Sequence, residues 1–191
     1  MRKQLLFVTM LLAIASCGSH ANQTPAELNS EALEIMQAGA DQGELQQVLE
    51  LTSQAIEKDK DFLPARNTRV NALLQLGDMD RVVQEAEAIA SINNTPGNQL
   101  YVCMAREVAN AGYPGQQSCY SGVIDLMEEN GRSADADANY LMAMKLANHP
   151  DFESHVWQYI EKQESESARQ VAEYLFIESS REEVLHSYFS L

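Results

Sequence analysis

Apolar residues recur every three or four positions along most of this chain, a spacing that places them on one face of an α-helix. We find no convincing alternation of period two, which would indicate strands. The stretches between breaks are rich in Ala, Leu, Glu, Gln, Met and Lys, all good helix formers. The five prolines stand at the edges of these stretches: Pro25, Pro64, Pro96, Pro114 and Pro150. The pattern predicts an all-α fold.

Local signals mark where several of these helices begin. Thr24-Pro25-Ala26-Glu27 has the form of a capping box with proline at the first helical position. Asn94-Thr95-Pro96 and Asn148-His149-Pro150 indicate further breaks of the same kind.

The first sixteen residues follow a different pattern. Arg2 and Lys3 precede an apolar run from Leu5 to Ala15, which ends in small residues. A charged start, a short apolar run and a small-residue cleavage site are typical of a secretion signal, and the run is too short to span a bilayer. We therefore expect residues 1–16 to be a signal peptide.

Residues 14–17, Ile-Ala-Ser-Cys, resemble the bacterial lipoprotein box. The resemblance implies that Cys17 becomes the new N-terminus and carries several acyl chains, which would hold the protein on the membrane. In this family the residue after the cysteine directs sorting, and an aspartate there favours the inner membrane. Gly18 at this position therefore implies the outer membrane, facing the periplasm. An ordinary cleaved signal that leaves a cysteine is the alternative. Residues 17–26 are then a lipidated cysteine and polar tether, and residues 27–191 one helical domain.

The charge balance excludes one class of partner. The full chain has 13 basic and 28 acidic side chains, a net charge of −15. Loss of Arg2 and Lys3 with the signal leaves 11 basic residues and a net charge of −17. Nucleic-acid binding needs clustered Lys and Arg, whereas here they stand singly among Asp and Glu. We therefore expect no nucleic-acid partner.

Two short glycine-containing segments suggest an internal repeat. They are Gly43-Glu44-Leu45 and Gly77-Asp78-Met79, and both are expected in turns. Their separation matches the period of tetratricopeptide repeats, about 34 residues. Residues 63–94 resemble such a repeat in this turn and in the second helix, where small and apolar residues recur: Val82, Ala86, Ile89 and Ala90. A third unit resembles the first helix of the repeat at Tyr101, Met104, Ala105, Val108 and Gly112.

This resemblance implies a solenoid of helical hairpins with about three repeats. It departs from the family at Arg66 and Arg69, which replace a large aromatic residue and a leucine, so that the second repeat packs loosely or its register slips. Beyond residue 133 the pattern decays into degenerate C-terminal helices. Terminal repeats are normally atypical, because they close the stack.

Cys103 and Cys119 are the only cysteines besides Cys17. In an oxidising periplasm such a pair is normally bridged, and the two lie on successive helices of one hairpin. A disulfide is the favoured interpretation, and two buried free thiols are the alternative.

No motif indicates catalysis. His149, His155 and His186, with Asp151 and Glu153, lack the four-residue spacing that stacks metal ligands on one helical face. Nucleophile, phosphate-loop and zinc-protease motifs are absent from the sequence. We predict no metal, no cofactor, no small-molecule substrate and no enzymatic activity.

Tetratricopeptide proteins usually bind peptides or partner helices on a concave face made by first helices. Asn and Arg suit this role, because they hydrogen-bond to peptide backbone and to carboxylates. By the register of the repeats, we expect this groove to be lined by eight residues: Leu33, Gln37, Asn67, Asn71, Leu74, Val102, Arg106 and Asn110.

The leading hypothesis is a non-enzymatic outer-membrane lipoprotein that serves as an adaptor for protein partners in periplasmic or envelope machinery. The alternative is a periplasmic immunity lipoprotein that binds and neutralises a secreted toxin. Its acidic charge would speed the capture of a basic toxin.

Overall fold

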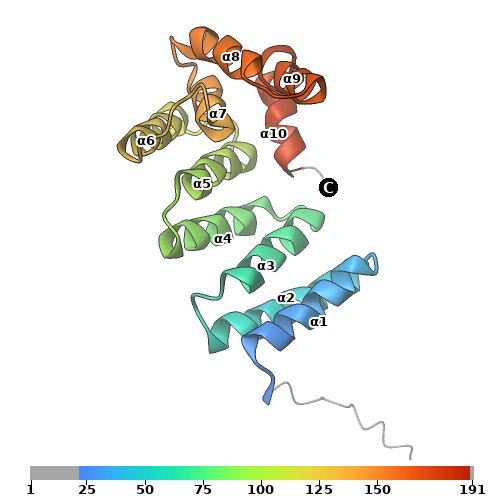
Figure 1. The fold of residues 1–191 in the computed structure, drawn as a ribbon. Coiled ribbons are helices and arrows are strands. Elements are labelled where there is room, and N and C mark those ends of the chain that lie inside the picture. The colour runs from blue at the N-terminus through green and yellow to red at the C-terminus, as the bar shows by residue number, and fades with distance from the viewer. Residues whose placement is uncertain (1–21, 190–191) are drawn as a thin grey trace, which may run out of the picture.

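The computed structural model describes residues 22–189 (Figure 1). These residues form ten α-helices and one π-helical segment, and they contain no strand. The elements are α1 (Pro25–Gln37), α2 (Gln42–Lys58), α3 (Leu63–Gln75), α4 (Met79–Ile92), α5 (Pro96–Ala109), α6 (Gln116–Glu129), α7 (Ala138–Ala147), α8 (Phe152–Glu161), α9 (Glu166–Glu173), η2 (Tyr174–Glu178) and α10 (Arg181–Phe189). The predicted signal peptide and the lipidation site at Cys17 lie outside the described residues.

Consecutive helices from α1 to α9 pack against each other, α1 also packs against α3, and α5 also packs against α7 and α10. Figure 1 shows the resulting stack of helical hairpins, with α1 and α2 at one end and α8 and α9 at the other. The predicted all-α hairpin solenoid is therefore confirmed. None of the described helices has the length and apolar character needed to cross a bilayer.

Side-chain caps fix where the helices begin. The Thr24 side chain accepts the Glu27 backbone N–H, and the Glu27 carboxylate accepts the Thr24 backbone N–H, as the capping box predicts. Asp41 and Glu44 form a second such box at α2. Helix α1 begins at Pro25, whereas the expected tether includes residues 25 and 26. The boundary between tether and helical domain therefore moves from residue 27 to residue 25.

The turn glycines correct the expected repeat spacing. Gly43 lies within α2, in the first turn after the Asp41 cap, and is not in a loop. The glycines that follow α1 and α3 are Gly39 and Gly77, which have φ values of 85° and 70°. A helix C-terminus favours glycine at such a left-handed position. Because Gly39 precedes Gly43 by about one helical turn, the first repeat is longer than the period expected from Gly43.

Replacement of Gly77 with alanine should lower the free energy of unfolding by about 1–2 kcal/mol, because a Cβ is strained at positive φ. Gly122 provides the control: it lies within α6, and an added Cβ there meets no atom within 4 Å. Gly122→Ala should therefore raise the free energy of unfolding by up to about 1 kcal/mol. Urea titrations of both variants, monitored by circular dichroism, test this, and effects of equal sign would contradict it.

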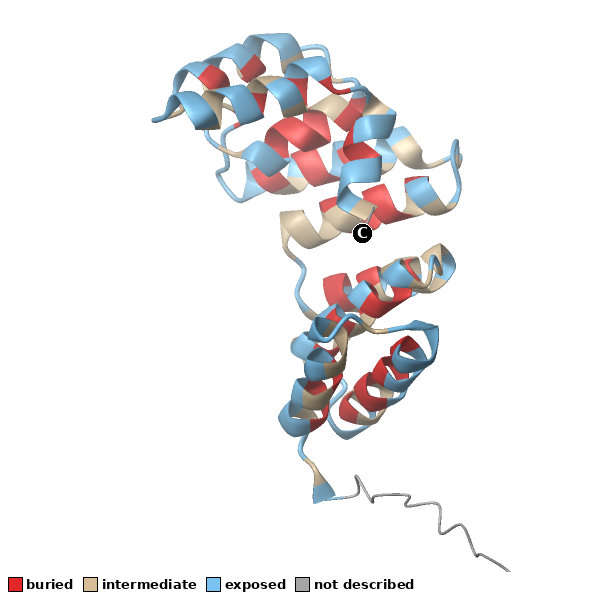
Figure 2. Cartoon of the chain, turned by 90° about the vertical axis from the view of Figure 1, so that its right-hand side faces the viewer, coloured by how far each residue is buried: buried red, intermediate tan, exposed pale blue. Residues whose placement is uncertain are grey.

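The buried side chains form two main cores (Figure 2). The N-terminal core is built mainly by α1–α4 and includes Leu28, Leu51 and Leu73. The C-terminal core is built by α5–α10 and includes Tyr120 and Leu141. Ala105 of α5 belongs to the first of these cores, whereas Leu100, Cys103 and Met104 of the same helix belong to the second, and Phe189 packs against both. The two halves of the stack are joined at α4 and α5.

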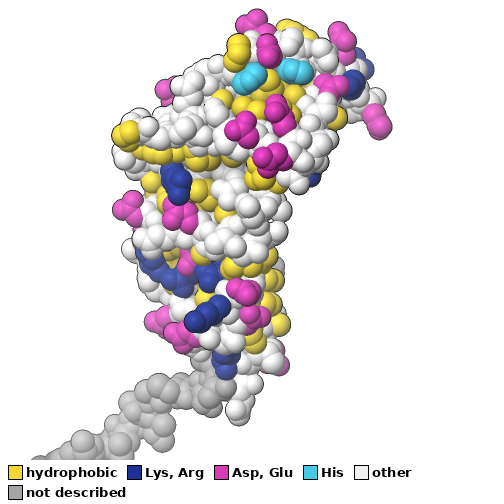
Figure 3. Space-filling view, turned by 90° about the vertical axis from the view of Figure 1, so that its left-hand side faces the viewer, with side chains coloured by type: hydrophobic (Ala, Val, Ile, Leu, Met, Phe, Trp, Pro, Cys, Tyr) yellow, Lys and Arg dark blue, Asp and Glu magenta, His cyan; other side chains and the backbone are white. Residues whose placement is uncertain are grey.

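Arg66 and Arg69, the departures from the repeat pattern, both pair with Glu85 of α4. Their guanidinium groups lie 2.9 Å from its carboxylate oxygens. The side chains of Arg66 and Glu85 are 14 % exposed, and that of Arg69 is 17 % exposed. Arg69 also donates to the hydroxyl of Ser53 in α2. An ion cluster thus joins α2, α3 and α4 where a tetratricopeptide repeat would use large apolar residues. Figure 3 shows Lys and Arg side chains gathered on the lower half of one face.

Candidate partner-binding surface

The structure leaves the predicted groove residues of α1 and α3 accessible. Leu33, Gln37, Asn67 and Asn71 are exposed. Leu33 and Gln37 are one helical turn apart in α1, as are Asn67 and Asn71 in α3, and the two helices pack side by side. We call these four residues the α1–α3 surface.

Leu74, the remaining predicted groove residue of α3, is half-buried. It lines an open cleft of about 640 Å³ beside the turn between α1 and α2, together with Ala40, Gln42, Leu45, Gln75 and Leu76. Leu74 therefore extends the α1–α3 surface towards this turn, rather than along the stack to α5.

The expected register on α5 differs from that in the structure. Val102 is buried, 3 % exposed, and packs against Ala86 and Ala90 of α4. Arg106 pairs with Glu87 of α4 at 2.8 Å, and Asn110 is the C-cap of α5. Each residue turns a helix by about 100°, so a register error of one position moves the predicted residues to another face. The eight predicted residues do not form one groove.

Helix α10 covers a different face of α5. Tyr101, the residue before Val102, stacks on Phe189 of α10 with a centroid separation of 5.2 Å. Figure 2 shows α10 lying across the upper half of the molecule, in front of the helices of the C-terminal core. The first helices of the three N-terminal hairpins are α1, α3 and α5. Of these, α5 is covered by α10, the last helix of the chain.

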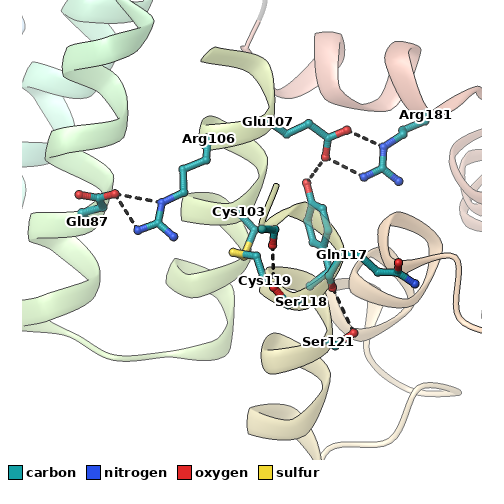
Figure 4. The surroundings of a disulfide bond; sticks show 11 residues. Glu87, Cys103, Arg106, Glu107, Gln117, Ser118, Cys119, Ser121 and Arg181 are labelled. Atoms are coloured by element: carbon teal, nitrogen blue, oxygen red, sulfur yellow. Dashed lines mark hydrogen bonds and ion pairs between the residues drawn. A yellow bond between two sulfur atoms is a disulfide. The ribbon is translucent and has the colours of Figure 1, made fainter. Parts of the chain in front are cut away.

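A buried ion pair fastens α10 to α5. The Arg181 Nε lies 2.5 Å from Glu107 Oε1, and its Nη2 lies 2.7 Å from Glu107 Oε2, a bidentate arrangement across 74 residues of sequence. The Glu107 side chain is 7 % exposed. Arg181 also donates to the Leu146 carbonyl of α7. Figure 4 shows Glu107 and Arg106, adjacent in sequence, reaching in opposite directions to Arg181 and Glu87.

Tyr120 of α6 completes this network. Its hydroxyl donates to Glu107 at 2.6 Å, and the Arg181 guanidinium lies 5.5 Å from its ring centroid. Burial raises the pKa of the Tyr120 phenol well above its usual range, and the hydrogen bond to the Glu107 carboxylate raises it further. The phenol therefore stays protonated as a donor.

Lys145 of α7 holds the segment that precedes α10. Its Nζ donates to three backbone carbonyls, those of Leu175, Phe176 and Ser179, at 3.2, 2.8 and 2.7 Å. A cation at a helix C-terminus satisfies carbonyls that lack helical partners. This cap and the Arg181 pair together fix the C-terminal helices in place.

Cys103 and Cys119 form the predicted disulfide, with a Cα–Cα distance of 5.7 Å (Figure 4). The bond joins α5 to α6 beside Tyr120, and Cys103 is 1 % exposed. The structure therefore contains the disulfide that the sequence favours, and not the two free thiols of the alternative interpretation.

Replacement of both cysteines with alanine should lower the free energy of unfolding by about 3 kcal/mol, since the bridge closes a loop of 16 residues. Guanidinium titration of the oxidised protein and the double variant measures the difference. Reduction with dithiothreitol should reproduce most of the shift. A variant as stable as the oxidised protein would contradict the expectation.

Among residues 22–189, no three His, Cys, Asp or Glu side chains gather as they would around a metal ion. His149 and His155 lie near the start of α8, whereas His186 lies in α10.

Sequence reasoning missed Glu107, Lys145 and Arg181. Glu107 follows Arg106 in a helix that carries no other charge, and a carboxylate on a helix packed into a core indicates a buried partner. Nothing in the sequence indicates that this partner is Arg181, because the two are brought together only by the tertiary fold.

The chain stands apart from the proteins with which it was compared. No protein-family model, no curated protein and no solved structure matches it. Its likeness to tetratricopeptide repeats therefore rests on the repeat residues of the sequence, and the hairpin architecture is compatible with it.

Proposed function

We propose that this protein is a non-enzymatic adaptor that binds protein partners in periplasmic or envelope machinery, held at the outer membrane by lipid on Cys17. The observation that carries the proposal is the α1–α3 surface. In a stack whose α5 is covered by α10, the first two hairpins keep Leu33, Gln37, Asn67 and Asn71 exposed. This surface is where the resemblance places peptide binding, and the fold leaves it open.

The chemistry of these side chains suits an extended or helical protein segment. Each Asn offers a donor and an acceptor to peptide backbone, and so does Gln37. Leu33, 37 % exposed, provides an apolar contact beside them. Hydrogen bonds to backbone would give affinity, and the apolar contact would select the side chains of the partner.

In-cell photo-cross-linking tests this proposal. A photoreactive residue is placed at Gln37 or Asn71, with Cys17 intact, and at Gln84, an exposed residue of α4, as the control. We expect several subunits of one envelope complex to be captured from Gln37 and Asn71 and not from Gln84. Asn67→Ala with Asn71→Ala should abolish that capture while thermal unfolding stays unchanged. Capture that is equal at all three positions would contradict the proposal.

The net charge of −15 favours one second candidate, an immunity protein that captures a basic toxin. A single toxin-like partner in the cross-linking experiment, with a toxin gene beside this one, would move the immunity function ahead of the adaptor. Secretion or pilus genes at that place would favour the adaptor.

A further inference from the structure

An apolar stripe is exposed on the helix formed by α9 and η2. Val171, Tyr174 and Ile177 are 62 %, 60 % and 43 % exposed. They recur at every third position and therefore lie on one side of the helix. Exposed apolar residues are ordinary when they are scattered, but a contiguous set indicates an interaction site. We call these three residues the C-terminal stripe.

The stripe is held by buried neighbours and is not a frayed end. Ala172 and Phe176, which alternate with the stripe residues, are 5 % and 3 % exposed in the C-terminal core. Phe176 meets Tyr159 of α8 edge to face, and Lys145 binds the backbone at the end of η2. The Ser179 N–H bonds to the Tyr174 carbonyl, five positions back, which makes this turn a π-helix. Such turns occur frequently at functional sites.

Acidic side chains border the stripe. Glu173 and Glu178 are next to Tyr174 and Ile177 in sequence, and neither side chain forms a hydrogen bond or ion pair within residues 22–189. Carboxylates outnumber Lys and Arg over residues 161–189. The cations of that segment, Lys162, Arg169 and Arg181, are each paired with a carboxylate, so they do not neutralise the rim.

We propose that the C-terminal stripe docks an amphipathic helix of a protein partner in which Lys or Arg flank the apolar face. The apolar side chains of that helix would cover Val171, Tyr174 and Ile177, and its cations would meet Glu173 and Glu178. Complementary charge of this kind steers association and fixes register.

The same charges disfavour two other occupants. A second copy of this chain would bring the carboxylates of two stripes together, and like charges across an interface are costly. An anionic bilayer surface would repel the acidic rim for the same reason. A basic helix satisfies both the apolar and the charged parts of the surface.

This inference names a partner class on a surface separate from the α1–α3 surface, and it rests on the proposed function only in treating the chain as a protein-binding module. The two are tested by different variants. Loss of binding at the C-terminal stripe leaves the cross-links from Gln37 and Asn71 in place, and the reverse also holds.

Fluorescence anisotropy with a designed peptide tests the proposal. The probe is a labelled peptide of about 18 residues, roughly five helical turns, with Leu on one face and Lys on the other. We expect Tyr174→Ser with Ile177→Ser to weaken its binding at least about tenfold, since two apolar contacts are lost. Val108→Ser, which removes an exposed apolar residue of α5 outside both surfaces without changing the charge, is the matched control and should bind as the parent does.

The contribution of Glu173 and Glu178 is tested separately, by the salt dependence of binding. Glu173→Gln with Glu178→Gln should weaken binding and make it less sensitive to salt. Equal loss in the Val108→Ser control, or no loss in the stripe variant, would overturn the proposal. So would a dimer in sedimentation equilibrium that the stripe variant abolishes, or stripe-dependent binding to phosphatidylcholine vesicles. Unchanged thermal midpoints show that these exposed substitutions leave the fold intact.

Discussion

Replacement of Glu107 with alanine is expected to lower the free energy of unfolding by about 4 kcal/mol, because loss of one member of a buried ion pair typically costs about 3–5 kcal/mol. The change removes the bidentate partner of Arg181 and the acceptor of the Tyr120 hydroxyl. The Arg181 guanidinium and the buried Tyr120 phenol then both lack the carboxylate that they contact in the parent protein. Guanidinium titration of the parent and variant proteins measures the loss.

The neighbouring residue provides the control. Arg106 also forms an ion pair, with Glu87, but the two side chains are 42 % and 43 % exposed. Exposed pairs contribute at most about 1 kcal/mol, so Arg106→Ala should be nearly neutral. Glu107→Gln, which keeps a hydrogen-bond acceptor, should fall between the two. If Glu107→Ala and Arg106→Ala have equal effects, the pair with Arg181 does not hold α10 in place.

Leu141→Ala is expected to lower the free energy of unfolding by roughly 4 kcal/mol as well, because removal of a buried leucine side chain costs its transfer free energy and leaves a cavity. Leu141 is 0 % exposed in α7, the helix at the centre of the C-terminal core. Urea unfolding followed by circular dichroism measures this change.

The control for this substitution is Leu33→Ala in α1, where the side chain is 37 % exposed and the loss should be below about 1 kcal/mol.

Leu73→Ala, in the N-terminal core, tests how the two cores are coupled. In a stack of hairpins each unit contacts mainly its neighbours. Hydrogen exchange should therefore accelerate most in α1–α4 for Leu73→Ala and most in α5–α10 for Leu141→Ala. Uniform acceleration would show a single cooperative unit.

Helix starts and the disulfide could be predicted from the sequence, whereas the side of each helix that faces its neighbours could not. The Thr24–Glu27 box and the prolines of α1, α3 and α5 act within one helical turn, so their residues alone determine the outcome. The disulfide is likewise predictable, because Cys103 and Cys119 lie on adjacent helices. These interactions need no knowledge of distant segments.

The α5 face required information that the sequence does not display locally. Val102 and Arg106 were placed by the register of the repeats, but the linkers and helix lengths differ between hairpins, as the long first interval from Gly39 to Gly77 shows. A small error in that register rotates the predicted face. The cover that α10 provides is harder still to predict, since Glu107 and Arg181 lie 74 residues apart.

That separation bears on the order in which the protein is completed. The N-terminal core draws almost entirely on residues before Ala105, so most of its packing partners are present early in synthesis. The C-terminal core includes Val184 and Leu185, and Phe189 bridges the two. Contacts that close long loops form late, because chain entropy opposes them. A chain whose synthesis has not yet reached α10 therefore leaves the Glu107 carboxylate without Arg181 and Tyr101 without Phe189, and exposes that defect to proteases until the last helix is made.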